Sequence, residues 1–518
     1  MKCSFSIIIV VIGSCMALSC AGFKSGGSGG AARSMLAEFG FEDVMAELDI
    51  MEPATDAVYP VDLAAPLFHW QGPATGRWLL KVTATGLDRP FYMAAFGNPW
   101  VPPGQDWDQI KALAPDRPLE LTVFQLAGRR AVARGTVRFT VSPIPLACRV
   151  VYQELPVPFS YAEKHVDQFR WRSLRPGATT PPATVLEKVP YCANCHTFSP
   201  DGAVFGLDMD YRGDRGGYVL ADVAGKMELR RSDVISWNDY LPGQGEVSRG
   251  LFARISPLGD YVIASAKERP FLVRIDDPAY SQLFFPLSGH LVYYSRRTGD
   301  IRALPGADHP DVVQTNPTWS PDGRTIAFAR AKAPENLWAA LGGKKLLDAA
   351  SGEDIHALNQ KYRMQFDLWQ VPFAAGAGGR ATPLAGASDN GKSNYFPRYS
   401  PDGRWIVFCQ SDTGLVSQPG SRLMIVPAGG GTVRAMTCNR NELNSWHSIS
   451  PNGRWMVFSS KPDGSRLTRV YLTHLDDDGR DTPAIRLHRI GTPDFAAILP
   501  EAVGLAADAF KQVRLVEP

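Results

Sequence analysis

Residues 189–211 read VPYCANCHTFSPDGAVFGLDMDY, and the turn within this stretch decides the fold. In SPDG at 199–202, proline and glycine favour a tight turn, aspartate can cap it, and an apolar strand follows. The pattern returns as SPLG at 256–259, SPDG at 320–323, SPDG at 400–403 and SPNG at 450–453. The serine-to-serine steps of 57, 64, 80 and 50 residues are longer and less regular than most β-propeller periods but fall in that regime. The repeat therefore predicts an all-β fold built around a propeller.

These units resemble the TolB-like, WD-like repeat of β-propellers, and the resemblance implies a six-bladed propeller over residues 189–492. Five repeats are visible, so the sixth blade must be irregular or be closed by segments remote in the sequence. The long step contains an insert at 334–362 whose spaced leucines favour a helix. The tail at 493–518 is also expected to be helical.

The chain between residue 34 and the propeller divides into three segments. A short helical segment is expected at 35–57, because Leu36, Phe39 and Leu48 have roughly helical spacing. Alternating strands at 58–151 favour a small immunoglobulin-like β-sandwich. Residues 152–188 are proline-rich and predict an extended connector.

The N-terminus predicts export. An apolar run ending near Cys20 is too short to span a bilayer comfortably and is typical of a signal peptide at 1–20. The sequence before Cys20 is similar to a lipoprotein cleavage box, so lipidation of Cys20 is expected, with soluble export as the alternative. The glycine-rich residues 21–34 would then form a flexible tether, and the protein would be a periplasmic or outer-membrane lipoprotein.

Cys192, Cys195 and His196 form C-x-x-C-H, the attachment sequence for c-type haem. Two thiols at this spacing can each form a thioether with a porphyrin vinyl group, while the histidine becomes an axial ligand of the iron. The motif predicts one covalent haem c. The alternatives are a Cys192–Cys195 disulfide and half of a zinc site, although the sequence has no second C-x-x-C and no H-x-x-x-H to complete the latter.

The stretch at 192–202, together with NSWHSISPNGRWMVFSS at 444–460, resembles exported bacterial propeller proteins that bear a haem-c motif. The resemblance implies the fold and the cofactor, and no settled activity. Leu258 departs from the repeat, which usually has aspartate there.

The second ligand of the iron would have to come from another part of the propeller, because the motif runs directly into the first repeat. His447 is the first candidate, since the first and last blades of a closed propeller are neighbours. The alternative is that His447 forms hydrogen bonds between blades. Met209 is the second candidate. Asp208 and Asp210 could bind calcium or act as acid and base, or could form turn and inter-blade hydrogen bonds.

The function favoured by these features is electron transfer between a haem-bearing propeller and a redox partner protein. One alternative is a binding or scaffold module for a protein or glycan, with a structural haem, and another is a haem-dependent oxidoreductase. With 54 basic and 52 acidic residues and no long basic run, nucleic acid is not an expected partner. We expect a monomer that meets the membrane only through its lipid anchor.

Overall fold

A computed structural model describes residues 28–277, 280, 283–334, 337–340, 342, 346–461 and 465–516. The predicted signal peptide, Cys20 and part of the predicted tether lie outside these residues. The chain divides into two compact units, Met1–Pro145 and Leu146–Pro518. In the part of the chain that the structure describes, no helix is long and apolar enough to cross a membrane.

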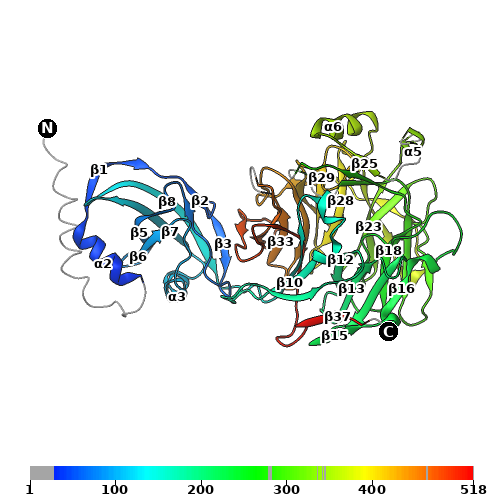
Figure 1. The fold of residues 1–518 in the computed structure, drawn as a ribbon, viewed down its shortest axis with the longest axis horizontal. Helices are drawn as coiled ribbons and strands as arrows, with labels where there is room; N and C mark the ends of the chain where they lie inside the picture. Colours follow the sequence, from blue (N-terminus) through cyan, green and yellow to red (C-terminus); the bar gives the residue numbers. More distant parts are fainter. Residues whose placement is uncertain are drawn as a thin grey trace. The chain divides into compact units, whose positions relative to one another are not determined.

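The N-terminal unit is built on one six-stranded sheet with a two-stranded ribbon and two helices (Figure 1). The main path of the sheet is β1 (Gly40–Glu47), β8 (Arg130–Ser142), β7 (Pro118–Ala127), β5 (Thr75–Ala84) and β6 (Phe91–Gly97), and β3 (Ala57–Pro60) also pairs with β8. The ribbon is β2 (Ile50–Glu52) with β4 (His69–Trp70), and the helices are α2 (Gly29–Glu38) and α3 (Gly104–Leu113).

Two predictions for this unit need correction. The helical segment expected at 35–57 is wrong, because α2 ends at Glu38 and β1 and β2 follow. Gly40 disfavours continuation of the helix and instead begins a parallel pairing with Arg130. The sandwich expected at 58–151 is β-rich as predicted, but its described strands form one large sheet and a small ribbon rather than two facing sheets.

The C-terminal unit contains six four-stranded sheets, so the predicted propeller is present with six blades among the described residues. Innermost strand first, blade 1 is β36 (Phe495–Val503), β9 (Arg149–Pro156), β10 (Arg170–Leu174), β11 (Ala183–Glu187); blade 2 is β12 (Ala193–Phe198), β13 (Val204–Met209), β14 (Gly217–Asp222), β16 (Val234–Ser236); blade 3 is β17 (Arg254–Ile255), β18 (Tyr261–Ala266), β21 (His290–Ser295), β22 (Ile301–Ala303). Blade 4 is β23 (Val313–Trp319), β24 (Thr325–Ala331), β26 (Asp367–Pro372), β27 (Thr382–Pro383); blade 5 is β28 (Ser393–Tyr399), β29 (Trp405–Ser411), β30 (Arg422–Pro427), β31 (Arg434–Ala435); blade 6 is β32 (Asn444–Ile449), β33 (Trp455–Ser460), β34 (Arg469–His474), β35 (Ile485–Arg486).

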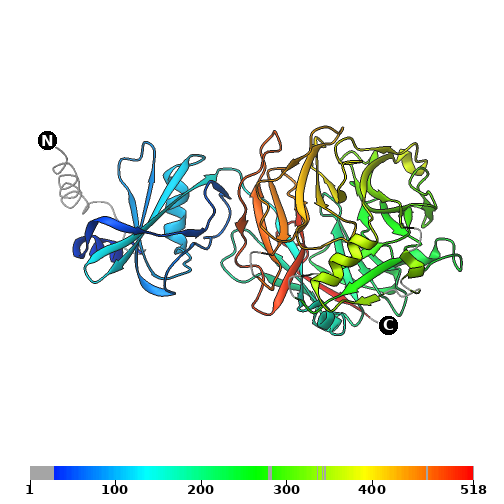
Figure 2. The same cartoon turned by 90° about the horizontal axis from the view of Figure 1, so that it is seen from above.

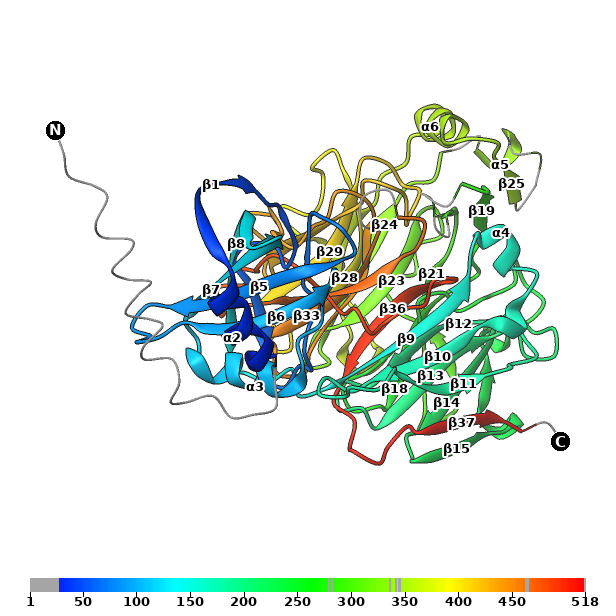
Figure 3. The same ribbon diagram turned by 60° about the vertical axis from the view of Figure 1, so that its left-hand side comes forward.

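Each innermost strand contacts the innermost strands of both neighbouring blades, which closes the ring. Blade 1 makes the closure from remote segments, since β36 pairs antiparallel with β9 (Figure 3). The connector expected at 152–188 is therefore wrong, because it supplies the outer strands of this blade. The helical tail expected at 493–518 is also wrong: it consists of β36 and of β37 (Gln512–Leu515), which pairs with β15 (Lys226–Leu229).

The repeated turns follow the predicted chemistry. The serine hydroxyl of each SPDG turn accepts from the backbone N–H five residues on, and donates to the aspartate carboxylate, as in Ser320 with Asp322 at 2.6 Å. The turn glycines all have φ between 69° and 74°, which is the left-handed region that glycine adopts freely. Leu258 cannot accept the serine's hydrogen bond, and its side chain is 82% exposed.

Insertions between the second and third strands of blades 3 and 4 form a small sheet of β20 (Leu283–Pro286), β19 (Pro270–Arg274) and β25 (Leu346–Asp348). The helix expected in the insert at 334–362 is present in part, as α5 (Leu337–Ala340) and α6 (Gly352–Lys361), and α6 lies over the blades in Figure 2. Arg274 pairs with Glu163 and Asp348 and so ties the insertion to blade 1, next to α4 (Phe159–Ala162). Short 3₁₀ turns complete the unit: η1 (Val166–Gln168), η2 (Arg231–Asp233), η3 (Trp237–Asp239) and η4 (Ala374–Gly376).

Candidate functional site: the axial pocket

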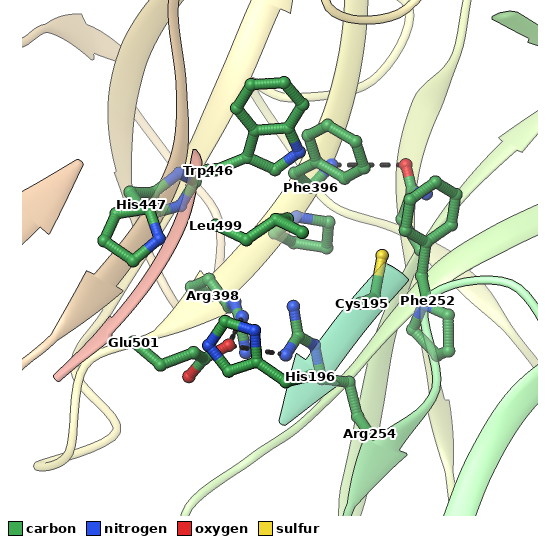
Figure 4. Close-up of a pocket in the computed structure, with 14 residues that line it drawn as sticks. Cys195, His196, Phe252, Arg254, Phe396, Arg398, Trp446, His447, Leu499 and Glu501 are labelled. Carbon is green, nitrogen blue, oxygen red and sulfur yellow. Dashed lines mark hydrogen bonds and ion pairs between the residues drawn. The ribbon is translucent and has the colours of Figure 1, made fainter. Parts of the chain in front are cut away.

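The axis of the propeller contains a pocket lined by residues from all six blades (Figure 4). Its lining residues occupy equivalent places in the repeats, four, three and two residues before the serine of the SPDG turn. Blade 1 has no such turn. Its equivalent residues are identified by the β-bulge in β36, where the register shifts between Ile498 and Glu501. The pocket is therefore a set of rings with one residue from each blade.

The upper ring consists of the residues four before the serine: Cys195, Phe252, Asn316, Phe396, Trp446 and Leu499. In blades 1, 2, 4, 5 and 6, the pairing of the innermost strand with the second strand shifts register at the upper-ring residue. These five residues therefore lie at β-bulges. Five of the six have φ between 43° and 60°, and Cys195 does not share this conformation. A non-glycine residue in this region costs roughly 1–2 kcal/mol, so the upper ring stores backbone strain around the pocket.

The upper ring is largely apolar. The rings of Phe252 and Phe396 contact each other edge to face with centroids 5.1 Å apart, and Phe284 from the β19–β20 hairpin stacks on Phe252 at 5.5 Å. Phe396 N–H donates to the Asn316 side-chain oxygen at 3.4 Å, which links neighbouring blades (Figure 4). Phe252, Phe396 and Trp446 all remain partly exposed, so their surfaces face the pocket.

Below this ring, Glu501 forms ion pairs with Arg254 at 2.7 Å and with Arg398 at 2.6 Å. These three side chains come from blades 1, 3 and 5, and all are at most 20% exposed. Burial alone would raise the pKa of Glu501, but the charges of Arg398 and Arg254 outweigh it and lower the pKa to about 2. The triad therefore holds three blades together at the axis.

His196 is 2% exposed, and neither of its ring nitrogens forms a hydrogen bond of normal geometry, although the Val151 backbone lies close enough to affect its pKa. Its pKa is lowered to about 4, mainly because burial disfavours the imidazolium, while Glu501 and the Val151 backbone oppose the shift. A buried polar group without a partner is costly. The unsatisfied imidazole leaves His196 able to bind a further group.

The two cysteines of the C-x-x-C-H motif are free thiols in the structure. Ala193 pairs with Met209 and His196 with Leu207, so β12 has one extra residue and bulges at Cys195. The bulge places Cys195 opposite Asp208, and the Asp210 N–H donates to the Cys192 carbonyl at 2.8 Å. Asp208 on β13 and Asp210 just after it are two residues apart, so they are expected to share a face, and the register puts both thiols toward that face.

This arrangement fits a covalent haem in its donors and departs from it in one orientation. Two reduced thiols on one face and an imidazole without partners are the groups that the attachment needs. Residues i, i+3 and i+4 share a face in a helix, whereas this motif lies on a strand. His196 therefore points away from Cys195, as Figure 4 shows, and its ring would have to turn to reach a group held by the thiols.

The structure brings His447 to the pocket and leaves Met209 out of its lining. His447 occupies the same repeat position as His196, on blade 6, and is 2% exposed. Its Nε2 donates to the Val407 carbonyl at 3.0 Å, and its Nδ1 faces the Cys409 sulfur at 4.0 Å. These contacts are the predicted inter-blade alternative, and ligation by His447 would require them to break. Met209 is buried in the apolar core of blade 2.

Asp208 is the most perturbed carboxyl beside the motif. Burial raises its pKa to about 7, against hydrogen bonds from Cys195 that lower it. Burial also raises the pKa of both thiols, so they are held in the neutral form. Among the described residues no group of three histidine, cysteine or acidic side chains could hold a metal ion, so the interpretation of Asp208 and Asp210 as calcium ligands gains no support.

The upper ring and the arginine–glutamate triad were not predicted from the sequence. Their signal is positional, because each member is a fixed number of residues before an SPDG serine. Aligning the repeats on that serine would have revealed them in five blades. The member from blade 1 has no such reference, because that blade lacks the turn.

Comparisons with known proteins give only distant structural likenesses. No family model matches the chain, and no curated protein matches it. Among solved structures it is similar to TolB from Acinetobacter baumannii, with 14% identity, a TM-score of 0.40, and coverage of 77% of this chain and 84% of that one. An oligogalacturonate lyase in complex with manganese has 15% identity, a TM-score of 0.38 and coverage of 59% and 70%. The β-propeller domain of the Trilobed protease from Pyrococcus furiosus has 10% identity, a TM-score of 0.29 and coverage of 57% and 71%.

Proposed function

We propose that the protein is an exported propeller that carries one covalent haem c at Cys192 and Cys195 and passes electrons to or from a partner protein. The observation that carries this proposal is the state of the motif, of which Cys195 and His196 line the axial pocket. Both thiols are free and share a face, and the adjacent His196 has no partner for either ring nitrogen.

Each residue of the motif has a distinct role in this proposal. The Cys192 and Cys195 thiols would hold the group as thioethers, and His196 would be its axial ligand. When bound, haem c supplies reversible one-electron chemistry between ferric and ferrous iron. The interrupted ladder between Ala193 and His196 is where β12 can turn the imidazole with the least loss of strand pairing.

The cellular setting is part of the same proposal. Residues 1–20 would direct export, Cys20 would carry a lipid, and residues 21–34 would tether the folded units to the periplasmic or outer membrane. The partner protein would dock on a face of the propeller, where the axial pocket opens. His447 and Met209 remain predictions for the second iron ligand.

A second candidate, a haem-dependent oxidoreductase, is favoured by the contacts of His447. Its Nε2 donates to the Val407 carbonyl at 3.0 Å, so His447 could fill a second coordination position only if this hydrogen bond broke. An open position would let a small molecule bind iron, which an electron carrier with two protein ligands prevents.

The test is a reduced-minus-oxidised absorption spectrum of the protein made in a host that matures c-type cytochromes. We expect the spectrum of a c-type haem, lost in the Cys192→Ala/Cys195→Ala variant and shifted in His196→Ala. Cys438→Ala is the matched control, because Cys438 is also a free thiol but is buried in a core cluster that does not include the motif. Carbon monoxide is then added to the reduced protein. An unchanged spectrum supports the electron carrier, and a shifted spectrum supports the oxidoreductase. A protein without a haem spectrum would refute both.

A further inference from the structure

A second cavity lies between blades 5 and 6, at the face of the propeller that carries the SPDG turns. It is lined by the turns at 400–404 and 451–454, by the connection at 475–479 that follows β34, and by side chains of the strands between them. Its volume is about 450 Å³. Small-molecule sites are usually cavities of about 300–1,000 Å³, so this space is large enough for a ligand.

The interface between blades 3 and 4 shows how four equivalent positions are filled elsewhere. Phe373 is surrounded there by three rings, with centroid distances of 4.9 Å to Tyr261, 5.3 Å to Tyr293 and 4.6 Å to Trp319. Each ring has a defined place in the repeat. Tyr261 is five residues after the turn serine of blade 3, Tyr293 pairs with the residue seven after it, Trp319 is one before the serine of blade 4, and the Phe373 N–H donates to the carbonyl four after that serine.

Blades 5 and 6 have Trp405, Ile425, Ile449 and Leu475 at these four positions, in the same order. Three of the four rings are thus replaced by smaller aliphatic side chains, and all four residues line the cavity. Protein interiors are close-packed and contain few voids larger than a water molecule. The space left by the missing rings is therefore available to a bound molecule.

Trp405 is the aromatic wall of this cavity, and its neighbours fix it in place. The Arg434 guanidinium lies 5.5 Å from the centroid of the indole, and its Nη2 donates to the Asp478 carbonyl at 2.8 Å. Gly479 packs so closely on the indole that a Cβ added there would lie 2.8 Å from Cε2. The wall is ordered before any ligand binds, which lowers the entropic cost of binding.

Charged groups of both signs complete the lining. They are the carboxylates of Asp402, Asp476 and Asp477 and the guanidiniums of Arg404 and Arg454. Asp477 pairs with Arg454 at 2.8 Å and with Arg404 at 3.4 Å, and Arg404 also pairs with Asp402 at 2.6 Å. These side chains are 29–70% exposed, so the cavity reaches solvent between them. Its opening therefore presents hydrogen-bond donors and acceptors side by side, with their charges already paired.

We propose that this cavity binds a neutral sugar. A pyranose has C–H groups that pack on an indole and hydroxyl groups that both donate and accept, so it matches an apolar wall beside mixed donors and acceptors. A charged ligand would instead need groups of one sign that are not already paired. The proposal goes beyond the haem-bearing motif and does not depend on it, because Cys192, Cys195 and His196 do not line this cavity.

The experiment titrates the full chain with the methyl glycosides of glucose, galactose and mannose, using saturation-transfer-difference NMR. We expect saturable binding of at least one, with a dissociation constant of about 1 mM, the affinity expected for so small a ligand. Leu475→Phe restores the ring that blade 4 has at this position and should remove saturable binding, and Trp405→Leu should weaken binding at least tenfold. Trp369→Leu is the matched control, because its indole also lies under an arginine, Arg330, but on blade 4 and outside the cavity lining.

The uronic acid counterpart of the sugar that binds tests the predicted class, because it differs only by a carboxylate. We expect it to bind more weakly, and equal or tighter binding would overturn a neutral ligand. Circular dichroism identifies a variant that fails to fold; if Trp405→Leu fails, Leu475→Phe decides, since it adds volume only to an open space. No saturable binding of any of the three glycosides, or binding that the two variants change no more than Trp369→Leu does, would overturn the proposal. Absence of covalent haem in the wild type would refute the proposed function and leave this inference standing.

Discussion

At the scale of residues, the two histidines of the axial pocket occupy equivalent positions and differ in their partners. His447 is satisfied by a neighbouring blade, whereas His196 has no partner for either nitrogen. The sequence could identify His196 through its motif, because the cysteine spacing is specific. It could not distinguish the two by burial or bonding, because those depend on which blades meet at the axis.

Glu501 is predicted to stabilise the propeller through its two arginines. Glu501→Gln leaves Arg254 and Arg398 uncompensated near the axis, and removing one partner of a buried ion pair costs about 3–5 kcal/mol. The measurement is the free energy of unfolding in urea at pH 7. The control is Glu228→Gln, which breaks an exposed pair with Arg230 and is expected to cost about 0–1 kcal/mol.

The pH dependence of the same variant gives a separate prediction. The pKa of Glu501 falls from 4.5 in the unfolded chain to about 2 in the fold, so its contribution is fully present above pH 4.5 and is lost as the pH falls toward 2. A shift of this size corresponds to about 3 kcal/mol. Wild type should therefore lose more stability than Glu501→Gln over this interval. Parallel stability curves for the two proteins would contradict the assignment.

At the scale of elements, the turns were predictable and blade 1 was not. The SPDG turns depend on local chemistry, which proline, glycine and aspartate reveal in the sequence. Strand β9 lacks such a turn and contains Glu154, a charged residue whose side chain the sequence alone would predict to be exposed. In the fold Glu154 is fully buried and pairs with Arg170 at 2.6 Å, a contact that only the neighbouring strand explains.

The turn with Leu258 is predicted to be the weakest of its kind. Leu258→Asp should restore the missing bonds to Ser256 and stabilise the protein by about 1 kcal/mol, the usual net value of a hydrogen bond. Asp322→Ala removes the equivalent contacts to Ser320 and Arg324, at 2.6 and 3.1 Å, and should cost a similar amount. Thermal unfolding measures both. Equal melting temperatures for wild type and the two variants would show that the cap contributes nothing.

At the scale of the whole molecule, closure of the ring depends on the last part of the chain. Strand β36 supplies the innermost strand of blade 1, and Arg149 on β9 donates to the carbonyls of Ala506, Ala507 and Ala509 at 2.6 to 2.8 Å. The sequence indicated a sixth blade that is either irregular or closed by remote segments. It could not identify them, because the alanine-rich tail has no strand periodicity.

Removal of residues 493–518 is therefore predicted to open the propeller. The truncated chain loses an innermost strand and exposes apolar surface on β9, β12 and β32, so cooperative unfolding should disappear or shift to a far lower temperature. The measurement is calorimetry of the truncated and full chains. A cooperative transition at the wild-type temperature would contradict closure through β36.

The central claim, that the propeller carries haem at Cys192 and Cys195, is tested most directly by the intact mass of the denatured protein. The protein is produced with the c-type maturation machinery and denatured in acid, which releases any haem that is not covalently held. The account predicts one haem added to each chain and none on the Cys192→Ala/Cys195→Ala variant. The mass of the bare polypeptide for the wild type would contradict it.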